Sequence, residues 1–523
     1  MQKFIFTLIF SLFFCSIFSQ NSYYVQFKDK NGTLFSLNSP QNFLSARALQ
    51  RRTNQGIALD STDLPVSQTY LNALVANEAT ILYRLKWFNG AEILLSNPAK
   101  VADIEALPFV EFVERTKTVL SSPNPRQNTP QQTSDLPAEF VQNSMLGVDL
   151  LHNEGFRGAG KLIAVLDAGF PNVNTMSAFD TIRARIVDTY NFVDMNANVY
   201  QHNSHGTLVL STIGAHIENQ IYGTAPEASF ALYISEEDGR ETRREPDNWI
   251  AAAERADSIG ADIITSSLGY YFFDDSPNLQ YSDLDGKTTR VSRAATITAR
   301  KGMVVVNSAG NEATSEWHYI IAPADADSIL CVGAVTKDSA NSTFSSYGPS
   351  YDMRVKPDIC AQGTNAFVVN TSNVLATANG TSFAAPIAAG MAASLWSAMP
   401  NVTNVSLMQK IRESAHRYSN PDVRYGYGIP NVWNIYENSL TTIQNVVSGN
   451  QNFFLEIKDN FLIIKCLNTD SYTFALFDII GRKIVSDTKN GNAEIALPNI
   501  VNGVYIVLIK NKNGIFSEKI IKK

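Results

Sequence analysis

Four polar residues stand where a predicted strand ends or a predicted helix begins. They are Asp167 at the end of LIAVLD, His205 before GTLVLSTIGA, Asn311 after VVVNSAG and Ser382 at the start of SFAAPIAAG. Each of them has an ordinary structural explanation when it is taken alone, such as a helix cap or a turn. Taken together, they are the groups that acyl transfer by a serine requires.

The required chemistry explains why these residue types belong together. A serine hydroxyl is a weak nucleophile, so it needs a histidine to accept its proton and a buried carboxylate to orient that histidine. Attack on a carbonyl also creates an oxyanion, which needs hydrogen-bond donors. Ser382, His205 and Asp167 supply the first three groups, and the Asn311 amide supplies a donor. Four independent structural explanations would all have to hold for this agreement to be accidental.

Ser382 lies between a glycine turn and a helix of small residues. Gly380 permits a tight turn of the backbone, and Ala384, Ala388 and Gly390 allow the helix to lie close to its neighbours. A hydroxyl at the beginning of a helix lies at the positive end of the helix dipole, beside N–H groups without helical partners. We therefore expect free N–H groups next to this serine.

Two short patterns suggest other kinds of site. GFRGAGKL, at residues 155 to 162, nearly matches a phosphate loop, but Leu162 stands where the metal-binding hydroxyl should be, and the pattern precedes a strand. His202 with His205 lacks a third metal ligand at suitable spacing. We therefore assign no metal ligand and expect the reaction to require no cofactor.

Clustered acids in one predicted loop leave calcium open as a structural ion. The acids are Asp274, Asp275, Asp283 and Asp285. Such clusters in loops are more often solvated than metal-bound, so the ligands of any calcium ion stay unassigned.

Residues 141–438 contain the elements that must position the four polar groups. Apolar runs such as KLIAVLD, GMVVVNSAG and SILCVGAV alternate there with helical stretches such as NWIAAAERADSIG. Strands that are apolar throughout are covered on both faces, so the pattern predicts an α/β domain with a parallel sheet and helices on both faces. Binding and catalytic groups gather at the carboxyl ends of such strands.

Different patterns flank this region. Residues 1–20 predict a signal peptide, because a lysine and a short apolar run precede small and polar residues. Residues 21–120 mix strand and helix patterns, as a small α+β domain does. Residues 121–140 are rich in Pro, Ser, Gln and Asn and predict a linker. Residues 447–523 predict short strands between turns, in a small antiparallel β-sandwich.

Composition limits the class of protein. The chain has 523 residues, which indicates several domains, and its net charge of −7 provides no basic surface for nucleic acid. No apolar stretch of membrane-spanning length follows residue 20, so we expect no transmembrane segment in the mature form. Cys331, Cys360 and Cys466 are odd in number and widely spaced, which argues against a disulfide framework but leaves a Cys331–Cys360 bridge open.

The motifs around the four polar residues resemble those of the subtilase family. VLDAGF resembles the aspartate motif of that family, with alanine where many members have serine or threonine. HGT with the following helix resembles the histidine motif, SAGNE the oxyanion-asparagine motif, and GTSFAAP with IAAG the nucleophile motif. KPDICAQG resembles the Lys-Pro-Asp segment that precedes the serine in family members. The resemblance covers roughly residues 140 to 438.

This resemblance implies a secreted, subtilisin-like serine endopeptidase that is made as a zymogen and cuts protein or peptide substrates. It implies a propeptide in residues 21–120, which would assist folding and inhibit the enzyme. It also implies that Ser267, Leu268 and Gly269, in SSLG, form the edge that pairs with the substrate main chain. The motifs do not indicate which substrate side chains are preferred beside the bond that is cut.

The tail resembles the C-terminal sorting domain of the type IX secretion system. Its pattern includes Gly503, Val504 and Tyr505 followed by strands and a lysine-rich end. The resemblance implies contact with the type IX secretion machinery and a secreted or cell-surface location. An alternative of another class is an inactive, protease-like surface module that binds protein or glycan, although all four reactive positions are intact.

Overall fold

The computed structural model describes residues 21–118, 141–442 and 453–522, the last range with short gaps at 459, 467–470, 480, 498–499 and 512–513. The predicted signal peptide and the predicted linker at 121–140 lie outside the described residues. The chain divides into two compact units between Trp433 and Asn434, and each unit is described by itself. Within the described ranges, no helix has the length and hydropathy that crossing a membrane requires.

The N-terminal domain is a small α+β domain. Its antiparallel sheet has the strand order β2-β3-β1-β4. Val25, Leu74, Ile93 and Leu95 are among its fully or almost fully buried core residues. Its elements are β1 (Asn21–Phe27), η1 (Pro40–Asn42), α1 (Ala46–Asn54), α2 (Gln68–Ala76), β2 (Thr80–Leu85), β3 (Gly90–Leu95), α3 (Lys100–Glu105) and β4 (Val110–Lys117).

The central domain is built on a seven-stranded parallel sheet, which confirms the predicted fold class. The strand order is β13-β12-β11-β10-β5-β9-β6, and each pair is parallel. Successive side chains of a strand point to opposite faces, so strands buried on both faces are apolar throughout. The strands are β5 (Leu162–Asp167), β6 (Ile186–Asn191), β9 (Ser229–Ile234), β10 (Ile263–Ser266), β11 (Val304–Ser308), β12 (Leu330–Val335) and β13 (Ile359–Gln362).

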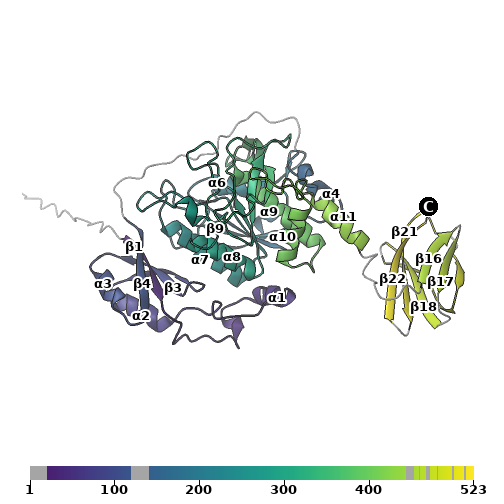
Figure 1. Cartoon of the computed structure of the whole chain (residues 1–523), viewed down its shortest axis with the longest axis horizontal. Coiled ribbons are helices and arrows are strands. Elements are labelled where there is room, and N and C mark those ends of the chain that lie inside the picture. The colour runs from purple at the N-terminus through teal and green to yellow at the C-terminus, as the bar shows by residue number, and fades with distance from the viewer. Residues whose placement is uncertain are drawn as a thin grey trace, which may run out of the picture. The chain divides into compact units, whose positions relative to one another are not determined.

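Helices cover both faces of this sheet (Figure 1). Helices α6 (His205–Gly214) and α9 (Thr381–Ala398) pack on one face, and α7 (Arg244–Ile259) and α8 (Arg290–Arg300) pack on the other. The remaining elements are shorter or peripheral: η2 (Ser144–Leu146), α4 (Val148–Asn153), η3 (Ser177–Phe179), α5 (Asp180–Arg183), β7 (His216–Ile217), β8 (Ile221–Tyr222), η4 (Tyr281–Asp283), β14 (Ala366–Val369), β15 (Leu375–Ala378), α10 (Asn404–Glu413) and α11 (Val432–Thr442).

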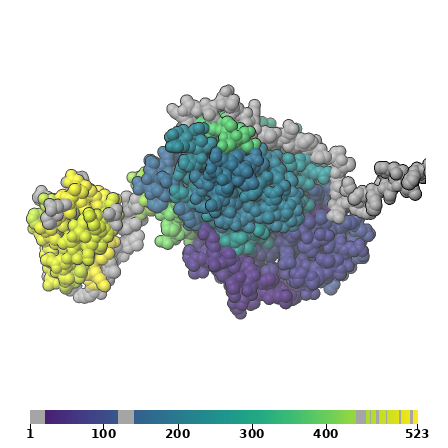
Figure 2. All heavy atoms as spheres, turned by 180° about the vertical axis from the view of Figure 1, so that it is seen from behind, coloured from purple at the N-terminus to yellow at the C-terminus, as the bar shows by residue number. Residues whose placement is uncertain are grey.

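The N-terminal domain lies with its sheet against α7 and α8 (Figure 1). Figure 2 shows the atoms of this domain, in purple, directly against those of the central domain. Tyr24, Tyr83 and Trp87 belong to the same buried apolar cluster as Trp249 of α7. Glu254 of α7 accepts hydrogen bonds from the backbone N–H groups of Lys86 and Trp87, both at 2.8 Å. One buried carboxylate thus holds the end of strand β2 and the residues that follow it.

A second contact between the two domains involves helix α1. The guanidinium groups of Arg51 and Arg52 both contact the buried carboxylate of Asp257, at the end of α7. Burial alone would raise the pKa of Asp257, but the charges of Lys86, Arg51 and Arg52 lower it below its ordinary value. The partners of Asp257 come from the N-terminal domain, so removal of that domain would leave this buried charge without them.

The C-terminal unit contains two antiparallel sheets, as predicted. Their strand orders are β16-β17-β20 and β19-β18-β21-β22. Leu462, Phe474 and Val507 are fully buried in its core. Its strands are β16 (Phe453–Lys458), β17 (Phe461–Cys466), β18 (Ser471–Asp478), β19 (Lys483–Asn490), β20 (Ala493–Ala496), β21 (Gly503–Asn511) and β22 (Gly514–Lys522).

Cys331 and Cys360 form no disulfide bond. Cys331 and Cys360 are buried on the adjacent strands β12 and β13, where Cys360 is paired in register with Gly333. The bridge between them that the sequence left open is therefore absent from this structure.

Helix α9 lies close to its neighbours because its residues are small. A Cβ atom added at Gly390 would lie 2.0 Å from Thr224 Oγ1 and 3.1 Å from the Thr224 carbonyl carbon. Thr224 is fully buried, so it cannot move away without disturbing the core. The helix that begins beside Ser382 is thus fixed by close packing.

We expect Gly390→Ala to lower the denaturant midpoint of unfolding. Overpacking costs about 1–3 kcal/mol, which exceeds the ~1 kcal/mol that alanine gains over glycine inside a helix. Guanidinium unfolding in a Ser382→Ala background, which prevents self-digestion, measures the change. Ser397→Ala in the same helix is the control, and an unchanged midpoint for Gly390→Ala would show that the contact is not tight.

Candidate active site

Asp167 and His205 form the first contact of the site. Asp167 is fully buried at the carboxyl end of β5, and His205 is the first residue of α6. The Asp167 Oδ1 atom lies 2.7 Å from His205 Nδ1 and accepts a second hydrogen bond from the Ala168 N–H at 2.8 Å. The two elements approach closely at Gly206, where an added Cβ would lie 2.4 Å from the Gly169 carbonyl oxygen. The glycine after the histidine is therefore a packing requirement.

The environment of His205 favours its charged form. Burial alone would lower the pKa of His205, but the charge and hydrogen bond of Asp167, together with the charge of Glu236, raise that pKa above its ordinary value. A carboxylate that binds Nδ1 also leaves Nε2 as the nitrogen that can accept a proton from a nucleophile. His205 is thus arranged as a base whose protonated state is stabilised.

Ser382 is the second residue of α9, and the hydroxyl of Ser267 fixes its backbone. The Ser267 hydroxyl donates to the Ser382 carbonyl at 2.7 Å. That carbonyl needs this partner, because Pro386, four residues later in the helix, has no N–H to donate. The N–H of Ser382 itself lies in the first turn of the helix, where no intrahelical acceptor exists.

Asn311 lies just beyond the carboxyl end of β11, and its amide is oriented by Thr381. Its Oδ1 atom accepts hydrogen bonds from the Thr381 N–H at 2.9 Å and from the Thr381 hydroxyl at 3.0 Å. Because the backbone N–H can only donate, the amide oxygen must face Thr381. The Nδ2 donor of Asn311 therefore faces away from Thr381 and is available to an oxyanion.

These residues converge on one cleft of about 830 Å³, lined by His205, Ser382 and Asn311, with Asp167 buried behind the histidine. The Ser382 hydroxyl donates to the Ser267 carbonyl at 3.4 Å, and its described hydrogen bonds do not include His205. The His205 ring centroid lies 6.0 Å from that of Phe383. A serine–histidine bond would form only after the hydroxyl leaves Ser267, and such bonds are often loose without substrate.

The predicted substrate edge also lines the cleft. Ser267, Leu268 and Gly269 directly follow β10. An added Cβ at Gly269 would lie 2.4 Å from the side chain of Ile321, so only glycine fits there. The next residue, Tyr270, pairs with Ala322 through two backbone hydrogen bonds of 2.7 and 3.1 Å. The segment is therefore held firmly beside the reactive groups.

The four clustered acids for which the sequence left calcium open each accept hydrogen bonds from different backbone N–H groups. Asp274 accepts from the Glu241 N–H, Asp275 from the Thr118 N–H, Asp283 from the Gln280 N–H and Asp285 from the Lys287 and Thr288 N–H groups. His202 pairs with Asp194 at 2.6 Å. Among the described residues, the acids whose ligand atoms gather within 4.8 Å of one another are Glu236, Glu241 and Glu245.

Sequence reasoning missed Glu236, a buried carboxyl in the same cleft. It accepts hydrogen bonds from the Tyr270 hydroxyl at 2.7 Å and the Ser235 hydroxyl at 3.1 Å. Burial raises the pKa of Glu236 to about 7, against the lowering effects of these two hydrogen bonds. The available signal was its place just after β9, which is the neighbour of β5. Nothing in the sequence indicated that Ser267 would bond to the Ser382 carbonyl or that Thr381 would orient the Asn311 amide.

Comparison with known families agrees with this geometry. Residues 158–428 match the model of the subtilase family, residues 22–135 match a peptidase S8 propeptide domain of Bacteroidota, and residues 456–523 match a secretion system C-terminal sorting domain.

Individual relatives and a solved structure agree with the family matches. The chain is 27% identical over 337 residues to a thermostable alkaline protease of Halalkalibacterium halodurans, covering 63% of this chain and 83% of the relative. It is 29% identical over 366 residues to subtilisin NAT of Bacillus subtilis subsp. natto, covering 67% and 81%. A serine-to-alanine mutant of the epidermin leader peptide processing serine protease of Staphylococcus aureus has a similar fold, with a TM-score of 0.57, 16% identity and coverage of 80% of this chain and 99% of that one.

The chain belongs to the subtilase family. It is a subtilisin-like serine peptidase with a propeptide domain before the peptidase domain. Its type IX sorting domain assigns it to the cell surface or the secreted fraction.

We expect Glu236→Gln to move the acid limb of the kcat/KM–pH profile to lower pH. His205 must be neutral to accept a proton, and the negative charge of Glu236 contributes to its raised pKa, so removing that charge lowers the pH at which the histidine deprotonates. The charges of His205 and Glu236 interact, so the limb is a property of the pair. The profile of Glu312→Gln, which alters another acid of the cleft, is the control. A limb that stays in place, or moves to higher pH, contradicts this electrostatic coupling.

Proposed function

We propose that this chain is a secreted serine endopeptidase, made as a zymogen, that hydrolyses peptide bonds through Asp167, His205 and Ser382. The observation that best supports the proposal is the convergence of groups from four distant segments on one cleft. The Asp167–His205 bond, at 2.7 Å, and the orientation of the Asn311 amide by Thr381 are the particular contacts on which it rests.

In the proposed reaction, His205 Nε2 takes the proton of Ser382 as the hydroxyl oxygen attacks the carbonyl carbon of the substrate. The negative charge moves to the carbonyl oxygen, which accepts hydrogen bonds from Asn311 Nδ2 and the Ser382 backbone N–H. The protonated His205 then gives its proton to the leaving amine, and an acyl-enzyme remains. Water, deprotonated by His205, attacks this ester and restores the serine.

The substrate main chain would pair with Ser267, Leu268 and Gly269. Such strand addition reads the backbone rather than side chains, so many sequences can be accepted. The backbone pairing of Tyr270 with Ala322 supports this assignment, because it holds the segment beside the cleft.

Two further parts of the proposal concern the inhibition of the enzyme before processing and its secretion. The N-terminal domain contacts α7, α8 and the acidic side of the cleft, as expected of an inhibitory propeptide. The C-terminal unit, through its sorting-domain match, would be recognised by the type IX secretion machinery.

We expect a fluorophosphonate probe to label the processed protein at Ser382 and to leave the Ser382→Ala variant unlabelled. The probe reacts only with an activated serine, so the result also tests the alternative of an inactive binding module. Casein hydrolysis is the second measurement. A well-folded, fully processed sample that neither reacts with the probe nor cuts casein would favour the binding module, and labelling of Ser382→Ala would mean that another residue is the nucleophile.

We expect Glu254→Ala to loosen the N-terminal domain after the linker is cut. The substitution leaves the N–H groups of Lys86 and Trp87 without their charged acceptor, and losing such bonds corresponds to about a 10- to 100-fold weaker Kd. Size-exclusion chromatography over a dilution series measures retention of the domain, and Glu227→Ala at a distant surface is the control. Equal retention by both variants would contradict the role of Glu254.

A further inference from the structure

One wall of the active-site cleft is strongly acidic. It is formed mainly by the connection between β9 and α7, at residues 235–243, and by the first turn of α7. The acidic residues that line the cleft are Glu236, Glu237, Asp238, Glu241, Glu245, Asp274 and Glu312, against the single arginine Arg240. A cleft of this charge attracts cations and repels acidic peptides.

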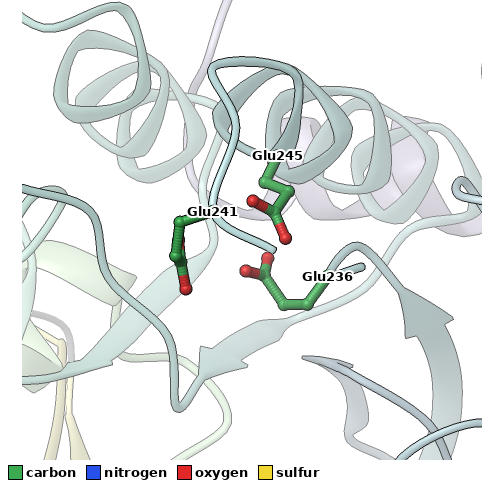
Figure 3. Close-up of side chains that lie close together, drawn as sticks. All are labelled: Glu236, Glu241 and Glu245. Carbon is green, nitrogen blue, oxygen red and sulfur yellow. The ribbon is translucent and has the colours of Figure 1, made fainter. Parts of the chain in front are cut away.

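Three of these glutamates point toward one another (Figure 3). The carboxylates of Glu236, Glu241 and Glu245 approach within 4.8 Å; the first two come from the segment that connects β9 to α7, and the third comes from the first turn of α7. The described ion pairs include none to Glu236 or Glu245, whose hydrogen bonds come from hydroxyl and backbone N–H groups. Burial, with the neighbouring charges of Glu241 and Glu236, raises the pKa of Glu245 well above its usual value. A positive group brought to this place would therefore be stabilised.

The chain itself supplies a cation at the edge of this wall. Lys117, the last residue of β4, donates from Nζ to both carboxylate oxygens of Glu237, at 2.5 Å from Oε1. The next residue, Thr118, donates from its N–H to Asp275 at 2.6 Å and from its hydroxyl to the same oxygen at 3.1 Å. The N-terminal domain thus reaches the acidic wall with a lysine that lies shortly before the predicted linker.

We infer that the acidic wall binds a lysine or arginine side chain of the substrate, within the few residues before the bond that is cut. The inference rests on the proposed function and adds the substrate class to it. Lys117 shows that an ammonium group fits beside Glu237, and Glu236 extends the same negative surface to His205. When the N-terminal domain leaves, Glu237 becomes available to the substrate as well.

In this inference the acidic wall selects the substrate and takes no part in the cleavage of the bond. Charge-assisted hydrogen bonds between an ammonium or guanidinium group and carboxylates are stronger than neutral ones. A neutral side chain of the same length would gain the apolar contacts of the cleft but none of these bonds. The preference therefore belongs to the charge rather than to the length of the side chain.

The test compares pairs of fluorogenic peptides that differ only by lysine or norleucine at one position, for each of the positions before the cut bond. We use the full chain after its own processing. We expect kcat/KM to be about 10- to 100-fold higher for lysine at one of these positions. Raising the salt concentration should lower this ratio, because salt screens the attraction.

Variants assign the preference to the wall. The double variant Glu236→Gln/Glu241→Gln should bring the lysine-to-norleucine ratio close to one, and Glu237→Gln, at a more exposed position, should reduce it even if the double variant does not fold. Glu227→Gln, on a surface outside the cleft, should leave the ratio unchanged.

Several outcomes overturn the inference. A wild-type ratio near one at every position, with the peptides still cut, defeats it and leaves the proposed function intact. A ratio that persists in the Glu236→Gln/Glu241→Gln and Glu237→Gln variants assigns the preference to other residues. Calcium binding that requires the three glutamates, measured calorimetrically together with a ratio near one, makes the cluster a metal site instead. Failure to cut any peptide, with Ser382 unlabelled by the probe, defeats the proposed function itself.

Discussion

The site depends on one buried carboxylate. Asp167 has no exposure to solvent, and the described hydrogen bonds of its carboxylate come only from the Ala168 N–H and His205. A buried charge is costly unless an opposite charge or several donors compensate for it. The buried Asp167 carboxylate is therefore stabilised most when its partner His205 is protonated and positively charged. That condition is the one reached as a serine gives up its proton. The strand order places Asp167 inside the sheet, on β5 between β10 and β9, and the glycine after His205 allows α6 to approach it.

The N-terminal domain is joined to the peptidase domain through a shared apolar cluster and through buried charges that the apolar pattern of the sequence does not reveal. Glu254 and Asp257 are buried on α7, and each contacts groups from the N-terminal domain. Removing one residue of such a buried pair costs far more stability than removing one residue of an exposed pair, because the remaining charge is buried without a partner. These buried contacts support the proposed role of the domain as an inhibitory propeptide.

The parts that follow from local pattern were predictable from the sequence. Apolar runs ending in Asp167 and near Asn311 specified strands buried on both faces, and the small residues after Ser382 specified a closely packed helix. Contacts between distant segments were not predictable, because no periodicity reports them. The Ser267 hydroxyl that satisfies the Ser382 carbonyl, and the Thr381 groups that orient Asn311, are known only once the chain is folded. The three glutamates that meet in the cleft lie close together in the sequence, but only the folded course of the segment between β9 and α7 shows that their carboxylates meet.

A crystal structure of the processed protein with a peptide boronic acid tests the central claim most directly, because a boronate bonded to a serine imitates the tetrahedral intermediate. The account predicts a bond between boron and Ser382 Oγ, with one boronate oxygen held by Asn311 Nδ2 and the Ser382 N–H and with His205 Nε2 within hydrogen-bond distance of the adduct. Boron bonded to another residue, or an adduct at Ser382 that His205 does not reach, would contradict it.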